Sequence, residues 1–203
     1  MLPPGQAPVT PELQQRLFEI LSSERFLSRQ GPGNEIPFFI CPYPPSDAVA
    51  MDDLRRDLVR DLGKAGVGIL DINLYDLSLE LLRADDVLEQ ILEEESTLSP
   101  DELLETLQGV LDPEHSLIPA IVQRMEANPF DILFLSGVGE TFPYLRSHKL
   151  LNNLQSAAKE KPTLLFFPGS YTHALASGAS LDLFGRLHND KYYRAFNILH
   201  IKV

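Results

Sequence analysis

Continuous apolar runs alternate with amphipathic stretches along most of this chain. Such runs predict strands over residues 36–41, 67–75, 130–136, 163–167 and 195–201. Uninterrupted apolar runs are typical of strands that are buried on both faces. Strands that alternate with helices favour parallel crossovers. The pattern therefore predicts an α/β fold: a three-layer, doubly wound, mostly parallel sheet of about five strands.

Apolar residues at helical spacing predict the helices that surround this sheet. The first helix is expected to begin after Thr10 as its N-cap, with Pro11 at its first position. Its apolar stripe consists of Leu13, Leu17, Ile20 and Leu21. The helix between the first two strands has a stripe of Leu54, Leu58, Leu62 and Ala65. Residues 1–9, rich in proline and glycine, are expected to form a flexible lead-in.

The negative charge of the chain is concentrated between Asp76 and Glu126. This segment has 14 acidic and two basic residues, a net charge of −12, which equals the formal charge of the whole chain. We predict an acidic helical insertion over residues 76–128, with one helix over residues 74–94. Two more helices are expected to begin at Ser99, with a capping box, and at Asp112. The insertion is either a solvated helical face or a surface that docks a basic partner.

Length and composition favour one globular domain over residues 1–203. Apolar residues make up 44% and charged residues 23% of the chain. The single cysteine, Cys41, excludes an internal disulfide and fits a reducing cytoplasm. We expect a cytoplasmic protein without membrane contact, because no signal sequence is visible and no apolar run approaches the ~20 residues that span a bilayer. Direct DNA binding is not expected of an acidic chain.

Two glycine-bearing loops follow predicted strands. Gly137 and Gly139 follow the third strand, and Gly169 and Tyr171 follow the fourth. Glycines let the backbone approach a ligand, and loop amides before a helix can bind an anion. No GxxxxGK[ST] motif is present, so the prediction is an NTPase-like core without a Walker A motif. The alternative is that these glycines only turn the chain.

Two polar groups near the carboxyl-terminal part of the chain are further binding candidates. Arg146, His148 and Asn152 lie close together in sequence, where a helix is expected to begin. They are predicted to contact an anion or a polypeptide, with Arg146 as the bidentate contact, unless the helix is simply exposed. The segment Tyr192, Tyr193 and Arg194 predicts a binding patch or a base-stacking surface; its tyrosines otherwise pack the sheet edge.

No catalytic or metal-binding pattern is found. The five histidines are scattered without an HExxH or HxH pair, and Cys41 has no CxxC companion. The loop with Ser170 lacks the GxSxG pattern of a serine hydrolase. Asp71 and Asn73 come closest to the pattern of an acidic strand end that holds a metal. We predict no metal, no cofactor and no catalytic residue.

Five segments together resemble one known family. They are FFICPYPP (38–45), INLYDLSLELL (72–82), FLSGVGETFPYLRSHKLLNNLQ (134–155), FFPGSY (166–171) and LDLFGRLHNDKYYRAFNI (181–198). In this order they resemble the BrxB family of BREX bacteriophage-defence systems. The resemblance implies a small cytoplasmic component of a defence island that also encodes a DNA methyltransferase, a large ATPase and a PglZ-type alkaline-phosphatase-like protein. It implies no catalytic residue.

Three functional hypotheses follow. The leading one is a non-enzymatic adaptor that binds the PglZ-type protein and other BREX components. The second is a divergent nucleotide-binding or nucleotide-hydrolysing domain that uses the loops of Gly137, Gly139 and Gly169 with Arg146 as the anion contact. The third, direct DNA binding, rests only on the net charge of +3 after residue 129. A homodimer stays open.

Overall fold

The structure is a computed structural model. It describes residues 6–28, 38–84, 86–174, 178–184, 187–190 and 195–201.

Five parallel strands form the central sheet, in the order β2-β3-β4-β1-β7. They are β1 (Phe38–Tyr43), β2 (Ile69–Asn73), β3 (Ile132–Ser136), β4 (Thr163–Ala174) and β7 (Phe196–Asn197). Each contains part of a predicted strand, and the α/β class with a mostly parallel sheet is confirmed. Every residue of β3 is buried, as the apolar run predicted.

The strand β2 departs from its prediction. It was expected to be buried on both faces over residues 67–75, but only Ile72 within it is buried. It lies at the edge of the sheet because β3 and β4 separate it from β1. The chain then turns directly into helix α4 (Leu74–Ala84), so the strand ends two residues early.

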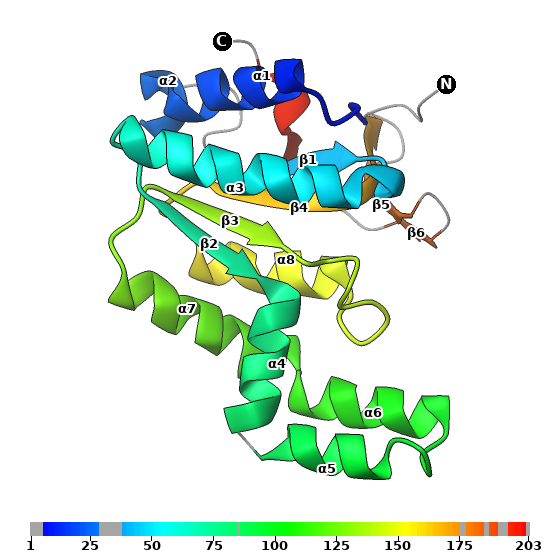
Figure 1. The fold of residues 1–203 in the computed structure, drawn as a ribbon. Helices are drawn as coiled ribbons and strands as arrows, with labels where there is room; N and C mark the ends of the chain where they lie inside the picture. Colours follow the sequence, from blue (N-terminus) through cyan, green and yellow to red (C-terminus); the bar gives the residue numbers. More distant parts are fainter. Residues whose placement is uncertain are drawn as a thin grey trace.

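Helices cover both faces of the sheet (Figure 1). On one face lie α1 (Pro11–Ser22), α2 (Glu24–Leu27) and α3 (Ala48–Lys64). On the other lie α7 (Ile118–Ala127) and α8 (Ser147–Ala157). The predicted cap of α1 is confirmed, since Thr10 Oγ1 accepts a hydrogen bond from Leu13 N at 3.3 Å.

The predicted apolar stripes are confirmed in α1 and for most of α3. Leu13, Leu17, Ile20 and Leu21 are buried in α1, and Leu54, Leu58 and Leu62 in α3. Ala65 was expected on the second stripe but is exposed, because it follows α3 as its C-cap. Amphipathic spacing therefore orients both helices correctly.

Between β2 and β3 the chain forms α4, α5 (Val87–Glu94), α6 (Pro100–Val110), a π-helical turn (Pro113–Leu117) and α7. The single helix predicted over residues 74–94 is wrong. It is interrupted between α4 and α5, where Asp86 takes a left-handed conformation with φ of 56°. Figure 1 shows α5 and α6 as a helical hairpin that projects away from the sheet.

The two other predicted helix starts in this region are confirmed. Ser99 and Glu102 form a capping box, with Ser99 N donating to Glu102 Oε2 at 2.8 Å. Asp112 Oδ1 accepts hydrogen bonds from the backbone amides of Glu114 and His115. The last helix nevertheless opens with a π turn rather than a regular α turn.

The predicted end of the fourth strand is wrong. Instead of stopping at residue 167, β4 continues to Ala174 and pairs antiparallel with β5 (Gly178–Leu183), which pairs with β6 (Leu187–Asp190). Pro168 and Gly169 resemble a turn in sequence, but both lie inside the strand. The last predicted strand is short, because β7 gives way to a 3-10 turn at Ile198–His200.

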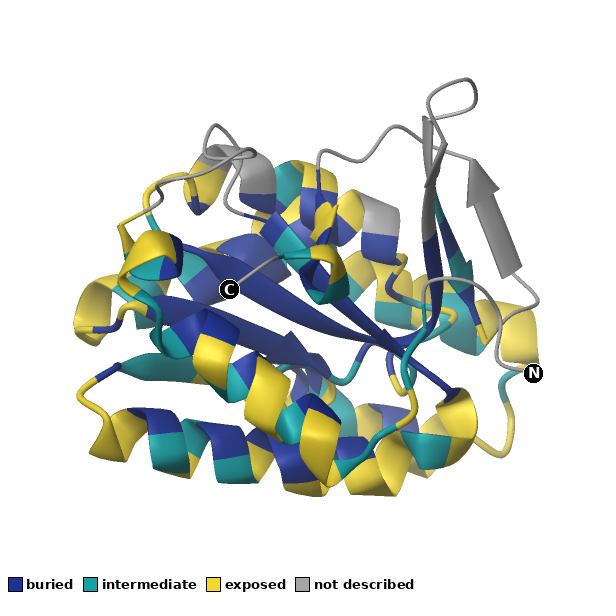
Figure 2. Cartoon of the chain, turned by 90° about the horizontal axis from the view of Figure 1, so that it is seen from above, coloured by how far each residue is buried: buried dark blue, intermediate teal, exposed yellow. Residues whose placement is uncertain are grey.

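The core lies in two clusters, one on each face of the sheet, and appears as the dark interior of Figure 2. Phe134 and Phe166 from adjacent strands meet edge to face, with ring centroids 5.2 Å apart. Within the described residues, no helix has the length and apolar character required to cross a bilayer.

The complete burial of β3 predicts that its side chains contribute strongly to stability. Leu133→Ala removes a side chain that is 0% exposed, and we expect the free energy of unfolding to fall by about 2–5 kcal/mol. Leu92→Ala, at a side chain that is 62% exposed, should change it by less than about 0.5 kcal/mol. Urea denaturation of both variants measures the difference. Equal midpoints would contradict this arrangement of the core.

Candidate functional site

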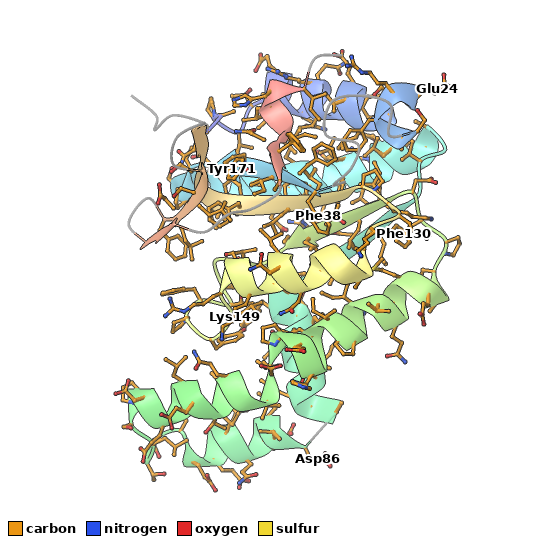
Figure 3. All side chains as sticks on the ribbon, turned by 180° about the vertical axis from the view of Figure 1, so that it is seen from behind. Glu24, Phe38, Asp86, Phe130, Lys149 and Tyr171 are labelled. Atoms are coloured by element: carbon orange, nitrogen blue, oxygen red, sulfur yellow. The ribbon has the colours of Figure 1, made fainter. Side chains whose placement is uncertain are left out.

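The carboxyl ends of the parallel strands form the candidate site, because open α/β sheets bind ligands outside this edge. The loops after β1, β2 and β3 lie there, together with the extension of β4. In Figure 3, Lys149 and Tyr171 lie toward this end of the sheet, and Phe130 lies at the opposite end.

The start of α3 carries its own negative charge. Asp47 precedes the helix, and its carboxylate accepts hydrogen bonds from Val9 N at 3.3 Å and from Ser46 Oγ at 2.9 Å. Pro44 and Pro45, just before it, have no N–H to donate. An anion at this helix start would meet the carboxylate of Asp47, which is unfavourable for phosphate binding.

Gly137 and Gly139 pack against neighbouring segments. Gly137 has a φ of 80°, and a Cβ there would collide with Asn73 Oδ1. That oxygen caps α4 by accepting hydrogen bonds from Tyr75 N at 2.8 Å and Asp76 N at 3.2 Å. A Cβ at Gly139 would lie 3.1 Å from Pro168 Cγ and 3.2 Å from Phe184 Cε1. Both glycines therefore serve close packing of the loop.

Gly169 and Tyr171 lie within β4 rather than in a loop. A Cβ at Gly169 would collide with the carbonyl oxygen of Asp182 on β5. Tyr171 is buried, and its hydroxyl donates to the carbonyl oxygen of Ala195 at 2.6 Å. Burial raises the pKa of Tyr171 to about 12, so its hydroxyl stays protonated. This side chain connects β4 to the segment that leads into β7.

The other predicted contacts are partly described. Arg146 immediately precedes α8 and is exposed, and its carbonyl accepts hydrogen bonds from Lys149 N and Leu150 N. Asn152 is exposed on the same helix. The backbone of His148 belongs to α8, but its side chain lies outside the described part of the structure. Tyr192, Tyr193 and Arg194 also lie outside the described residues.

An ionic cluster around the buried Arg55 of α3 was missed by the sequence analysis. Arg55 is 8% exposed and donates to Asp71 on β2 and to Asp52 Oδ1, the latter at 2.6 Å. Burial raises the pKa of Asp71, and the neighbouring Arg55 only partly offsets this effect. Burial disfavours the charge on Arg55, but its two carboxylate partners outweigh burial and raise its pKa. The signal in the sequence that could have revealed this cluster is Asp71, an aspartate inside a mostly apolar run.

Further buried polar groups lie on the same side of the sheet. Tyr43 is 9% exposed, and its pKa is raised first by burial and then by the charge of Glu140. Ser136 Oγ is buried without a hydrogen-bond partner in the described structure, as is Arg55 Nε. Alternation along β3 places Ser136 on the face of Phe134, which packs in the α3 cluster. This is the part of the edge best suited to a small polar ligand.

In the described part of the chain, no group of three or more histidine, cysteine, aspartate or glutamate side chains is placed to hold a metal ion. Asp71 and Asn73, the strand-end pair considered from sequence, instead bind Arg55 and cap α4. The thiol of Cys41 is buried, which raises its pKa to about 12 and makes it a poor nucleophile.

The glycine at 137 gives a test of this packing. Gly137→Ala should destabilise the protein by about 1–3 kcal/mol, because it adds a Cβ at positive φ against the cap of α4. Gly63→Ala is the matched control: it lies in α3 with no atom near its Cβ position and should stabilise by about 0.5–1 kcal/mol. Thermal and urea unfolding measure both changes. A neutral Gly137→Ala would mean that the loop is not closely packed.

Comparison with known proteins identifies clear relatives. The model of the family described as BREX protein BrxB matches residues 70–198. A BREX protein BrxB of Bacillus cereus (strain H3081.97) is 33% identical over 194 residues, covering 92% of this chain and 97% of the relative. A BREX protein BrxB of Escherichia coli O9:H4 (strain HS) is 28% identical over 194 residues, covering 94% of each chain. No solved structure matches.

Proposed function

The chain belongs to the BrxB family and is thus a component of a BREX anti-phage defence system, and from this premise we propose that it acts as a non-enzymatic adaptor. Its partner in this proposal is the PglZ-type protein of the system, with other BREX components joining the same assembly. The proposal places the adaptor in the cytoplasm. It treats residues 1–203 as one domain, in which an NTPase-type core without a Walker A motif carries an acidic helical insertion.

The observation that carries the proposal is the use of the strand ends for internal packing. Asp47 occupies the start of α3, Asn73 caps α4 against Gly137, and Gly169 allows β4 to pair with β5. In α/β enzymes these positions hold phosphate, metal or substrate. A sheet whose edge is used in this way supports a function based on its outer surface.

The exposed residues at the start of α8 are the contacts that the proposal assigns. Arg146 and Asn152 are exposed, and an arginine can bind a partner carboxylate bidentately. Tyr192, Tyr193 and Arg194 remain part of the proposed binding surface on sequence grounds. Direct DNA binding is not part of the proposal, because the chain has a net charge of −12.

The adaptor function predicts a defined complex. The purified chain should capture the separately expressed PglZ-type protein of its system, and size-exclusion chromatography with light scattering should give a fixed stoichiometry. The same run on the chain alone reports whether it is a homodimer. An unrelated protein of equal net charge is the control. No complex at micromolar concentration with any component of the system would refute the adaptor proposal.

A nucleotide-binding function is the alternative, and one observation favours it. Ser136 Oγ, at the last residue of β3, is buried without a partner in the described structure, and so is Arg55 Nε beside β2. Buried polar groups normally have partners, and a bound ligand is one way to supply them. This alternative keeps the loops of Gly137, Gly139 and Gly169 as ligand contacts, with Arg146 as the anion contact.

Melting curves distinguish the two functions. The adaptor proposal predicts an unchanged Tm with millimolar ATP, GTP or their diphosphates and magnesium. A nucleotide at 100 times its Kd would stabilise the folded state by about 2.7 kcal/mol, a rise of about 5–11 °C for a chain of this size. Such a rise, absent with magnesium and inorganic phosphate alone, would favour the nucleotide function.

A further inference from the structure

The helical hairpin of α5 and α6 has an unusual charge. Between Asp86 and Leu111 the chain has eight acidic residues and no lysine, arginine or histidine. The acidic residues are Asp86, Glu89, Glu93, Glu94, Glu95, Asp101, Glu102 and Glu105. All eight are exposed. Like charges at this density repel one another, and the repulsion opposes formation of the two short helices.

This charge is not compensated within the described structure. None of the eight carboxylates forms an ion pair with a described cationic side chain. The acidic residues of α3 differ, because Arg56 pairs with Asp52 and Asp53 there. Arg60 and Lys64 pair with Asp57 and Asp61 in the same way. The hairpin therefore presents its negative charge to the surroundings.

The hairpin also leaves apolar side chains only partly covered. α6 has four apolar residues at helical spacing, yet none of its residues is buried. They are Leu103, Leu104, Leu107 and Val110. Three of them, Leu103, Leu107 and Val110, pack against the core although they stay partly exposed. In α5 only Ile91 is buried, and the next residue, Leu92, is 62% exposed. Amphipathic helices normally bury their apolar residues, but Leu92 and, in part, Leu104 stay accessible to a partner.

Charge and apolar exposure together indicate which kind of partner the hairpin would bind. A bare apolar face would accept many partners, but one bordered by eight carboxylates favours a cationic partner and disfavours an anionic one. A second copy of this chain is disfavoured, because each copy brings the same net charge of −8 to the contact. A third helix that packs on a two-helix hairpin completes a common arrangement.

We infer that the α5–α6 hairpin is a docking site for a basic amphipathic helix of another protein. The apolar stripe of that helix covers Leu92 and Leu104, and its lysines and arginines pair with the exposed carboxylates of the hairpin. The inference deepens the proposed function and rests on it, in that the chain acts by binding another protein; it names the surface and the chemistry of the contact.

A designed peptide tests this inference on the full chain. The probe is a synthetic helix with leucine at positions i, i+3, i+4 and i+7 and lysine at most others, labelled for fluorescence anisotropy. We expect saturable binding that weakens at least about tenfold between about 0.05 and 0.5 M NaCl. Amide hydrogen exchange should slow in α5 and α6 upon binding. A scrambled peptide of equal composition should bind at least about tenfold more weakly.

Matched variants locate the site. Leu92→Gln and Leu104→Gln remove apolar side chains that are not buried, without a change in charge, and together should weaken binding at least about tenfold. Val49→Gln, at an exposed valine on α3, should not. Glu93→Gln should weaken binding, and Glu160→Gln, at an exposed residue outside the hairpin, should have little effect. Circular dichroism confirms that each variant is folded.

Each outcome decides the inference. Absence of binding, equal binding of the scrambled peptide, or equal effects of the hairpin and control variants would overturn it. The proposed function fails separately, because capture of the PglZ-type protein does not depend on the peptide. A chain that captures that protein but ignores the peptide keeps the adaptor function and loses this surface.

Discussion

Burial of β3, β4 and β1 on both faces is the constraint on which the rest of the structure depends. Every residue of β3 is buried, and Phe134 and Phe166 link adjacent strands in the core. A parallel sheet of this kind is stable only when helices cover both of its faces. The crossover connections therefore supply helices to both sides, with α3 on one face and α7 and α8 on the other. Because the strands are parallel, their carboxyl ends meet at one edge.

That edge is held together by groups that other α/β proteins use for ligands. Asn73 supplies the cap of α4, and Gly137 is a glycine because that cap leaves no room for a Cβ. Arg55 joins α3 to the edge strand through Asp71, which keeps the buried cation paired at the cost of desolvating the guanidinium and part of the carboxylate. These contacts give polar residues at the strand ends a structural reason to be present.

The α5–α6 hairpin follows different physics from the body of the molecule. The body is stabilised by apolar burial, and its acidic residues on α3 are paired with arginine or lysine in the same helix. The hairpin has little burial, uncompensated charge and a left-handed residue, Asp86, at its entrance. Regions of this kind are the least stable parts of a fold, and surfaces that bind a partner are often found in them.

The sequence by itself determined the features that depend on neighbours along the chain. Apolar runs located the central strands, helical spacing located the buried faces of α1 and α3, and short-range hydrogen bonds produced the caps at Thr10, Ser99 and Asp112. It also determined the segregation of negative charge, and the order of five sequence segments indicated the family. The signals for strands, helix faces and caps each act within about one helical turn or one strand.

Only the tertiary structure decided which strand lies at an edge and what each strand end contacts. β2 has an apolar run like the central strands, but it is more exposed because it lies at the edge and pairs with β3 on one side only. Pro168 and Gly169 suggest a turn, yet pairing with β5 continues the strand and buries Tyr171. Arg55 meets Asp71 across 16 positions of sequence. These contacts depend on pairings between distant segments, whose energy no local pattern contains.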